Sequence, residues 1–250
     1  MPEPKQPEKD PVKKLDATIA TRPTRRRRAA AFQAYVLIAS VVFIGLAVVA
    51  RNVPYFSIDL TVTRAIQGYH GVVFDRVMFG LSWLGFQPQT LVLCVLLVAL
   101  LFVAGLRWEA VVTLFAAGAT GVSTLVKLLV DRPRPSVDLV YVLREISMSG
   151  FPSGHVLTFT ALCGFLAFLV YTLLKPSWGR TTLLATAFVL VILMGFSRIY
   201  QGQHWFSDVM GGYLLGSLWL ALTIWLYRWG KLRFFTHQPV APEIPAASTT

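Results

Sequence analysis

The sequence predicts an all-α fold, a polytopic membrane bundle of six transmembrane helices with short interfacial helices. Hydrophobic residues make up 55% of the 250 residues and charged residues only 14%, whereas soluble domains carry roughly 25% charged residues. Six apolar runs approach the roughly 20 residues that a helix needs to cross the hydrocarbon core. These runs are residues 29–50, 90–106, 109–130, 156–174, 181–200 and 208–227.

The first apolar run follows a strongly basic segment. The net charge is +11, and nine of the 23 Lys and Arg residues lie before residue 30, ending in four arginines at 25–28. A basic cluster beside an apolar run is typical of a cytoplasmic flank, so we expect a membrane protein without a nucleic-acid partner. Residues 1–28 are expected to form a disordered cytoplasmic tail. The run at 29–50 exceeds a secretory h-region of roughly 7–15 residues, although a signal-anchor cleaved after Ala50 is an alternative.

Residues 51–89 mix apolar residues with charge. The stretches 56–66 and 72–85 are too polar for convincing spans and suit amphipathic helices that lie in the membrane interface. Trp83 and Phe86 would then lie at headgroup level. Helices that cap the bundle and helices that guide a substrate are both compatible with this pattern.

The basic residues predict the orientation of the bundle. If six spans alternate, most basic connections fall on the side of the N-terminal tail, which the positive-inside tendency makes the cytoplasm. These residues are Arg107, Lys175, Arg180, Arg228, Lys231 and Arg233. We therefore expect a multi-pass protein of the plasma membrane, with a domain at 29–230 and a disordered C-terminal tail at 231–250. Both termini would be cytoplasmic, and connections 51–89, 131–155 and 201–207 would face outward.

Two further features are interpreted as packing. Cys94 and Cys163 lie within apolar runs and offer neither a disulfide framework nor metal-ligand spacing. Gly212-Tyr-Leu-Leu-Gly216 in the last run follows the small-xxx-small pattern of closely packed membrane helices.

Three polar clusters interrupt this apolar chain at the outer ends of the third to sixth spans. They are KLLVDRPRP at 127–135, PSGH at 152–155 and SRIYQGQHWFSD at 197–208. Each has a simpler explanation. The explanations are a snorkelling Lys127, solvated loop charges at Arg132 and Arg134, an N-cap at Ser153, a satisfied helix-end histidine at His155, and an i,i+4 pair of His204 with Asp208. Because all three clusters fall at one membrane depth, we favour a functional site.

The residue types in these clusters suit phosphoryl chemistry. Lys127, Arg134 and Arg198 supply three positive charges, and guanidinium groups match phosphate oxygens bidentately. The helix that begins after Ser153-Gly154 adds backbone N–H donors. Two histidines from different helices, His155 and His204, face this anion cradle and supply a nucleophile or a general acid. No carboxylate cluster is present for Mg²⁺, so we expect neither a metal nor another cofactor.

Asp208 follows His204 by four residues, about one helical turn. A carboxylate at this spacing can keep one imidazole nitrogen protonated and leave the other free to attack. This favours His204 as the nucleophile, although the residues alone do not decide between the two histidines.

Together the three clusters resemble the signature of the type 2 phosphatidic acid phosphatase superfamily, the lipid phosphate phosphatases, in its bacterial integral membrane branch. The exact motifs span 127–208, and the six-span layout extends the resemblance to about 30–230. The resemblance implies a metal-independent phosphatase that forms a phosphohistidine. It makes His204 the nucleophile, Asp208 its orienting partner and His155 the general acid. It assigns phosphoryl binding to Lys127, Arg134, Ser153, Gly154 and Arg198.

We therefore expect an integral membrane enzyme that removes a terminal phosphate from a lipid mono- or diphosphate at the outer leaflet. Polyprenyl diphosphate, phosphatidylglycerol phosphate and phosphatidic acid are the candidate substrates, and the compact chain favours a polyprenyl diphosphate or a broad specificity. Arg132 is either a second-phosphate ligand or a loop charge. The alternatives are a phosphotransferase that passes the phosphoryl group to an alcohol, and a non-catalytic lipid-binding or transport protein.

Overall fold

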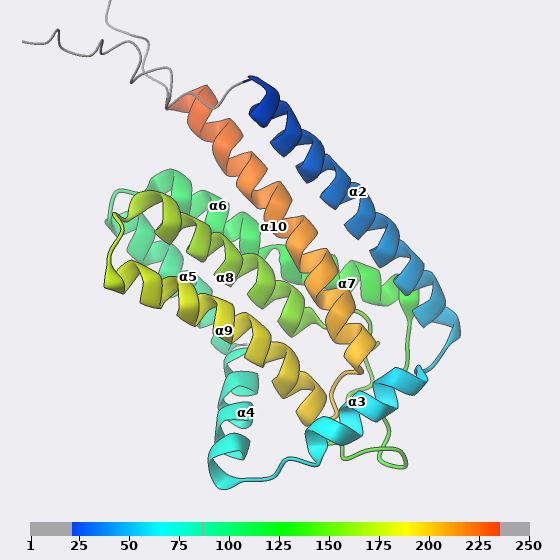
Figure 1. The fold of residues 1–250 in the computed structure, drawn as a ribbon. Coiled ribbons are helices and arrows are strands. Elements are labelled where there is room, and N and C mark those ends of the chain that lie inside the picture. The colour runs from blue at the N-terminus through cyan, green and yellow to red at the C-terminus, as the bar shows by residue number, and fades with distance from the viewer. Residues whose placement is uncertain (1–21, 87, 236–250) are drawn as a thin grey trace, which may run out of the picture.

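The computed structural model describes residues 22–86 and 88–235. Its regular structure within these residues consists of helices, without strands (Figure 1). They are α2 (Arg22–Asn52), α3 (Ser57–Gln67), α4 (Val72–Leu84), α5 (Gln89–Val103), α6 (Arg107–Ala117), α7 (Ala119–Val130), α8 (Gly154–Leu173), α9 (Trp178–Tyr200) and α10 (Phe206–Phe234). The all-α prediction is thus confirmed.

Five described helical segments are long and apolar enough to cross a membrane. These segments are Arg26–Asn52, Arg107–Val130, Gly154–Leu173, Trp178–Tyr200 and Phe206–Phe234. The second comprises α6 and α7, which meet at Gly118. A sixth span results if α4 and α5 count together as one broken span, so the predicted polytopic bundle is confirmed.

The sixth span differs in detail from the prediction. Helix α5 has 15 residues and is about 22 Å long, shorter than the ~30 Å hydrocarbon core. Helix α4, expected to be a separate interfacial helix, adjoins it across a bend of 66°. Pro88 immediately precedes α5, and proline cannot continue a helix because it lacks the N–H donor and clashes with the preceding turn.

The long helices also run further than the sequence predicted. Helix α2 begins at Arg22, within the segment expected to be disordered, because arginine sustains a helix well. Helix α10 continues to Phe234, and its Lys231 Nζ lies 2.7 Å from the carboxylate of the buried Glu109 in α6. That ion pair joins residues 231–234 to the bundle. The rest of the two expected tails, 1–21 and 236–250, lies outside the described residues.

Helix α8 lies at the centre of the bundle and packs against α6, α7, α9 and α10. The expected small-xxx-small packing is confirmed on α10. A Cβ added at Gly212 would lie 2.9 Å from the Ser153 carbonyl oxygen, and one at Gly216 would lie 2.9 Å from that of Leu157. The two glycines therefore bring the backbone of α10 close to the first turn of α8, where two of the polar clusters meet.

The polar clusters gather at one end of the bundle, where α7 and α9 end and α8 and α10 begin (Figure 1). Helix α3 lies across this end and packs against α9 and α10. Figure 1 shows the start of α2 and the end of α10 side by side at the opposite end. The described chain therefore enters and leaves the bundle on the side away from the polar clusters.

Candidate active site

A cavity of about 310 Å³ lies where the polar clusters meet. Six of the eight predicted site residues line it, and Ser153 and Asp208 are buried beside it. The six are Lys127, Arg134, Gly154, His155, Arg198 and His204. The structure thus brings together residues from α7, α8, α9 and the two connections that follow α7 and α9. The volume of this cavity is within the range of small-molecule sites.

His204 presents one specific nitrogen to the cavity. Its Nδ1 lies 2.8 Å from the carbonyl oxygen of Gly150, which can only accept, so Nδ1 carries the proton. Its Nε2 lies 3.3 Å from Nη1 of Arg134, which can only donate, so Nε2 carries a lone pair. Both neighbours select the same neutral tautomer, in which Nδ1 donates to Gly150 and Nε2 accepts from Arg134.

The surroundings of His204 also keep the ring neutral. Burial lowers its pKa well below the usual histidine range, and the positive charges of Arg134, Lys127 and Arg198 lower it further. A neutral imidazole is nucleophilic, whereas a protonated one is not. His204 thus has the neutral form that a nucleophilic role would require.

Asp208 does not make the hydrogen bond to His204 that the sequence predicted. Its Oδ2 lies 3.7 Å from Nδ1 of His204, which is an ion-pair distance but too long for a hydrogen bond. The Gly150 carbonyl holds Nδ1 instead. Asp208 Oδ2 accepts from the backbone N–H of Trp205 at 2.9 Å, so the carboxylate fixes the start of α10 and places its charge near the imidazole.

The structure contradicts the interpretation of Arg132 as a solvated loop charge and gives the residue a structural role. The residue is 1% exposed, and its guanidinium lies between two buried carboxylates, 2.6 Å from Asp208 and 3.0 Å from Asp59 of α3. It also donates to Ser207 Oγ at 2.7 Å. With most of its donors engaged by protein oxygens, Arg132 is not a solvated loop charge. It also lines the larger cavity described below, so its role towards a second phosphate stays a prediction. The buried carboxylates explain its position because a buried charge needs a partner.

Several buried polar atoms around the cavity lack hydrogen-bond partners in the described structure. They are Ser123 Oγ, Ser153 Oγ, His155 Nε2, and Nε and Nη2 of Arg198. The remaining Arg198 amino group donates to Ser82 Oγ, and Phe86 packs over the guanidinium. Unsatisfied buried polar groups are rare and costly in native proteins. Their concentration around one cavity indicates a site for a polar, anionic ligand.

Ser153 occupies the predicted N-cap position of α8, but its side chain makes no capping hydrogen bond. The hydroxyl is buried and remains available beside the cavity. Gly154 is the first residue of α8, so the cavity adjoins the N-terminus of a 20-residue helix, where backbone N–H groups and the helix dipole favour an anion.

Two cations of the cradle are held by a backbone loop. Lys127 Nζ donates to the Ser149 carbonyl at 2.6 Å. Arg134 donates to the carbonyls of Met148 at 2.7 Å and Gln203 at 2.6 Å. Burial lowers the pKa of Arg134, while the nearby Asp208 charge opposes this effect. An anion in the cavity would therefore meet cations that are already positioned.

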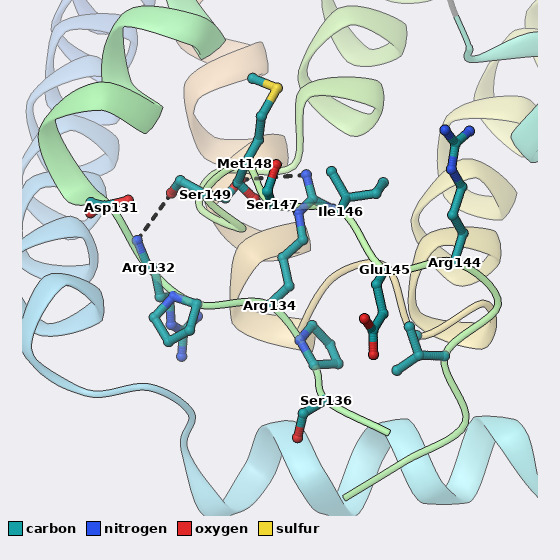
Figure 2. Close-up of a pocket in the computed structure, with 14 residues that line it drawn as sticks. Asp131, Arg132, Arg134, Ser136, Arg144, Glu145, Ile146, Ser147, Met148 and Ser149 are labelled. Carbon is teal, nitrogen blue, oxygen red and sulfur yellow. Dashed lines mark hydrogen bonds between the residues drawn. The ribbon is translucent and has the colours of Figure 1, made fainter. Parts of the chain in front are cut away.

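A larger cavity of about 740 Å³ adjoins the first, between the segments 131–136 and 142–149 (Figure 2). Arg134, Ile146 and Met148 line both cavities. Figure 2 shows the Arg134 side chain between these two segments, with hydrogen bonds to the loop at 148–149. Arg134 thus separates the buried site from a polar chamber at the end of the bundle.

Sequence reasoning missed four contributors to the site. They are Asp59, Ser82, Phe86 in its contact with Arg198 and His155, and the carbonyl of Gly150. An isolated acid in a short apolar helix is a signal that could have identified Asp59. The other three contacts have no sequence pattern, because a backbone carbonyl, a serine and a phenylalanine occur everywhere. No group of three or more His, Cys, Asp or Glu within the described residues could hold a metal ion.

A buried, cation-lined cavity at the end of a membrane-spanning bundle defines a membrane protein that binds an anionic headgroup. Comparison with known proteins identifies its family. The model of the PAP2 superfamily matches residues 106–232. Phosphatidylglycerophosphatase B of Bacillus subtilis is 30% identical over 178 residues, which are 70% of this chain and 86% of that protein.

Solved structures agree with this assignment. The transmembrane PAP2-type phosphatidylglycerolphosphate phosphatase from Bacillus subtilis is 26% identical with a TM-score of 0.66, over 77% of this chain and 96% of that one. LpxE of Aquifex aeolicus shares the fold with a TM-score of 0.56 and 21% identity, over 69% of this chain and 98% of that one.

The chain belongs to the PAP2 superfamily, in its bacterial integral membrane branch. It is a multi-pass membrane protein and a lipid phosphatase. The phosphatase relatives favour an enzyme over the non-catalytic alternative considered from the sequence.

Proposed function

We propose that this phosphatase removes the terminal phosphate of a membrane lipid through a phosphohistidine at His204, without a metal ion. The observation that carries the proposal is the neutral His204, whose Nε2 lone pair faces Arg134, beside unsatisfied donors around the same cavity. The phosphoryl group would lie among Lys127, Arg134 and Arg198, with Ser153 and the backbone N–H of Gly154 as further donors.

The reaction proceeds in two steps. His204 Nε2 attacks phosphorus, the bond from phosphorus to the lipid oxygen breaks, and His155 donates a proton to that oxygen. His155 lines the cavity, and its unpartnered Nε2 is the group available for this transfer. The negative charge of a bound phosphate favours the protonated imidazole that the step requires. Water then attacks phosphorus and gives a proton to the now neutral His155, the bond from phosphorus to His204 Nε2 breaks, and inorganic phosphate leaves neutral His204 and protonated His155.

The three cations stabilise the charge that spreads over the equatorial oxygens in each transition state. Asp208 supports the imidazolium character that develops on His204 as its Nε2 bonds to phosphorus. Arg132, in turn, compensates the Asp208 charge when the site is empty. The protein groups thus supply the positive charge that metal ions supply in many phosphoryl-transfer enzymes.

The orientation of the site is part of the proposal. The arginines at the start of α2 and the basic residues at the end of α10 lie at the end of the bundle away from the cavity. The positive-inside tendency makes that end cytoplasmic, so the cavity faces outward. A reporter enzyme that works only in the cytoplasm should be active when fused after Thr250. Activity there of a reporter that works only outside the cytoplasm would contradict this orientation.

The defining experiment is phosphate release by purified protein in detergent, with EDTA present. The substrates are phosphatidic acid, phosphatidylglycerol phosphate and polyprenyl diphosphate, and His204→Ala is measured beside the unaltered protein. Release that survives EDTA and disappears in His204→Ala supports the proposal. Release that requires a divalent metal, or that persists in the variant, contradicts it. If an added alcohol captures the phosphoryl group in preference to water, the enzyme is a phosphotransferase.

A further inference from the structure

The guanidinium of Arg198 is held by two residues that lie outside the three polar clusters. Arg198 is 0% exposed, and its Nη1 donates to Oγ of Ser82 in α4. Phe86, two residues beyond the end of α4, packs over the guanidinium with its ring centroid 5.3 Å from Cζ. The ring covers the face of the guanidinium and limits its tilt, while the hydrogen bond limits its rotation within the plane. The end of α4 thus determines how Arg198 is oriented.

The contact with Ser82 leaves one particular edge of Arg198 free. Nε and Nη2 are buried and have no hydrogen-bond partner within the described residues. These two nitrogens form one edge of the planar guanidinium, and their parallel N–H groups match two oxygens of a phosphate. Nη1 lies outside this edge and is the nitrogen that Ser82 engages. Ser82 therefore anchors the guanidinium without using the donors that a two-point contact with phosphate requires.

Gln201 fixes the direction of the Ser82 hydroxyl. Its Oε1 lies 2.8 Å from Ser82 Oγ, and its Nε2 lies 3.2 Å from the carbonyl oxygen of Met78. That carbonyl can only accept, so the amide NH₂ of Gln201 faces it and the amide oxygen faces Ser82. Ser82 has a single hydroxyl proton and donates it to Gln201. Its lone pairs are therefore left to accept from Arg198, and each group in this chain has one role.

The local alternative for Ser82 is not used. A serine within a helix commonly donates to the carbonyl four residues earlier, which for Ser82 is that of Met78. Gln201 donates to this carbonyl, and Ser82 donates to Gln201 instead. Both side chains are 1% exposed, so bulk water does not replace a lost partner. The serine thus serves the arginine of α9 rather than its own helix.

We propose that Ser82 is a positioning residue for phosphate binding. It holds Nη1 of Arg198 so that Nε and Nη2 face the phosphoryl group, and Gln201 acts by orienting the Ser82 hydroxyl. This inference rests on the proposed function, in which Arg198 binds the phosphoryl group. It gives α4, which the sequence predicted as an interfacial helix, a part in recognition of the headgroup.

The test uses inorganic phosphate as the probe of the cradle. Its inhibition constant is measured together with kcat and KM for the lipid phosphate that the unaltered protein hydrolyses fastest. The variants are Ser82→Ala, Gln201→Met, the double variant, and Ser82→Thr, which keeps the hydroxyl. Ser217→Ala is the matched control. Ser217 also accepts from another helix, from Tyr35 at 2.6 Å, and donates to a carbonyl, that of Leu214 at 2.8 Å, but it does not line the cavity.

Ser82→Ala should raise the inhibition constant of phosphate and the KM about tenfold, the lower end of the range for one hydrogen bond to a charged group. Gln201→Met should raise them less, because the hydroxyl remains but can rotate. The double variant should be no worse than Ser82→Ala, since Gln201 acts through Ser82. Ser82→Thr should retain most of the phosphate affinity, and Ser217→Ala should leave all three constants unchanged.

A serine with a purely structural role would lower the active fraction, and hence kcat, while KM and the inhibition constant stayed the same. That result for Ser82→Ala would overturn the positioning role, and so would fully additive effects of the two substitutions. If Ser82→Ala does not fold, an unchanged inhibition constant in Gln201→Met overturns the proposal and a raised one supports it. Failure of phosphate to inhibit the unaltered protein would reject the phosphate cradle of the proposed function, and this inference with it.

Discussion

Arg132 offers the sharpest test of how the site is supported, because the structure gives it a role that the sequence did not suggest. Replacing it with Met removes the guanidinium between Asp59 and Asp208 while keeping much of the side-chain volume. Both carboxylates and Arg132 have side chains that are 0% exposed. Breaking a buried ion pair by removing one partner costs about 3–5 kcal/mol. With two carboxylates left uncompensated, we expect Arg132→Met to reach this range.

The magnitude can be measured as a shift in the thermal midpoint of unfolding in detergent. For a chain of this size, 1 kcal/mol corresponds to roughly 2–4 °C, so Arg132→Met should lower the midpoint by about 6–20 °C. Phosphatase activity should fall on monophosphate and diphosphate lipids alike, because the residue supports Asp208.

The matched control is the double variant Arg132→Met with Asp59→Asn, which removes one of the two stranded charges. It should be more stable than Arg132→Met alone. An unchanged midpoint in Arg132→Met, or no recovery in the double variant, would refute the buried charge network. A loss of activity confined to diphosphate substrates would return Arg132 to the role of a second-phosphate ligand.

Two other predictions concern the histidines. His155→Ala should slow hydrolysis of a lipid phosphate by about 10²–10⁴-fold but should affect an aryl phosphate much less, because a good leaving group needs no proton; equal losses on both would remove the general-acid role. His204 should remain neutral with Nδ1 protonated at pH 6.5, which ¹⁵N NMR of histidine-labelled protein reports directly. Because its pKa is lowered by folding, the unfolded chain binds more protons, so its contribution to stability is complete above the usual histidine pKa and is lost as the pH falls through the folded-state pKa. A spectrum with both nitrogens protonated at pH 6.5 would contradict the assigned tautomer.

The sequence predicted the fold class and the assembly of the site because both depend on local patterns. Apolar runs identify the spans, and the motif residues sit at span ends, so counting spans placed Lys127, His155, Arg198 and Asp208 at one end of the bundle. That convergence is what the structure contains.

Contacts between distant segments were beyond sequence reasoning. Asp59 and Arg132 are separated by 73 residues, so the sequence around either one does not identify the other as its partner. The i+4 spacing of Asp208 suggested that its carboxylate accepts the hydrogen bond from His204 Nδ1. The Gly150 carbonyl accepts it instead, and a backbone carbonyl has no residue-type signature in the sequence. The sequence also predicted α4 and α5 as separate elements, whereas together they can form one span with a bend between them.

The most direct test of the account is to trap the covalent intermediate. The purified protein is mixed with lipid phosphate that is isotopically labelled in the phosphoryl group. The reaction is stopped in alkali within one turnover, and the position of the label is mapped by mass spectrometry. A phosphorylated imidazole at His204 should appear before free phosphate and should be absent from His204→Ala. Label on His155, or release of phosphate by His204→Ala at the rate of the unaltered protein, would contradict the central claim.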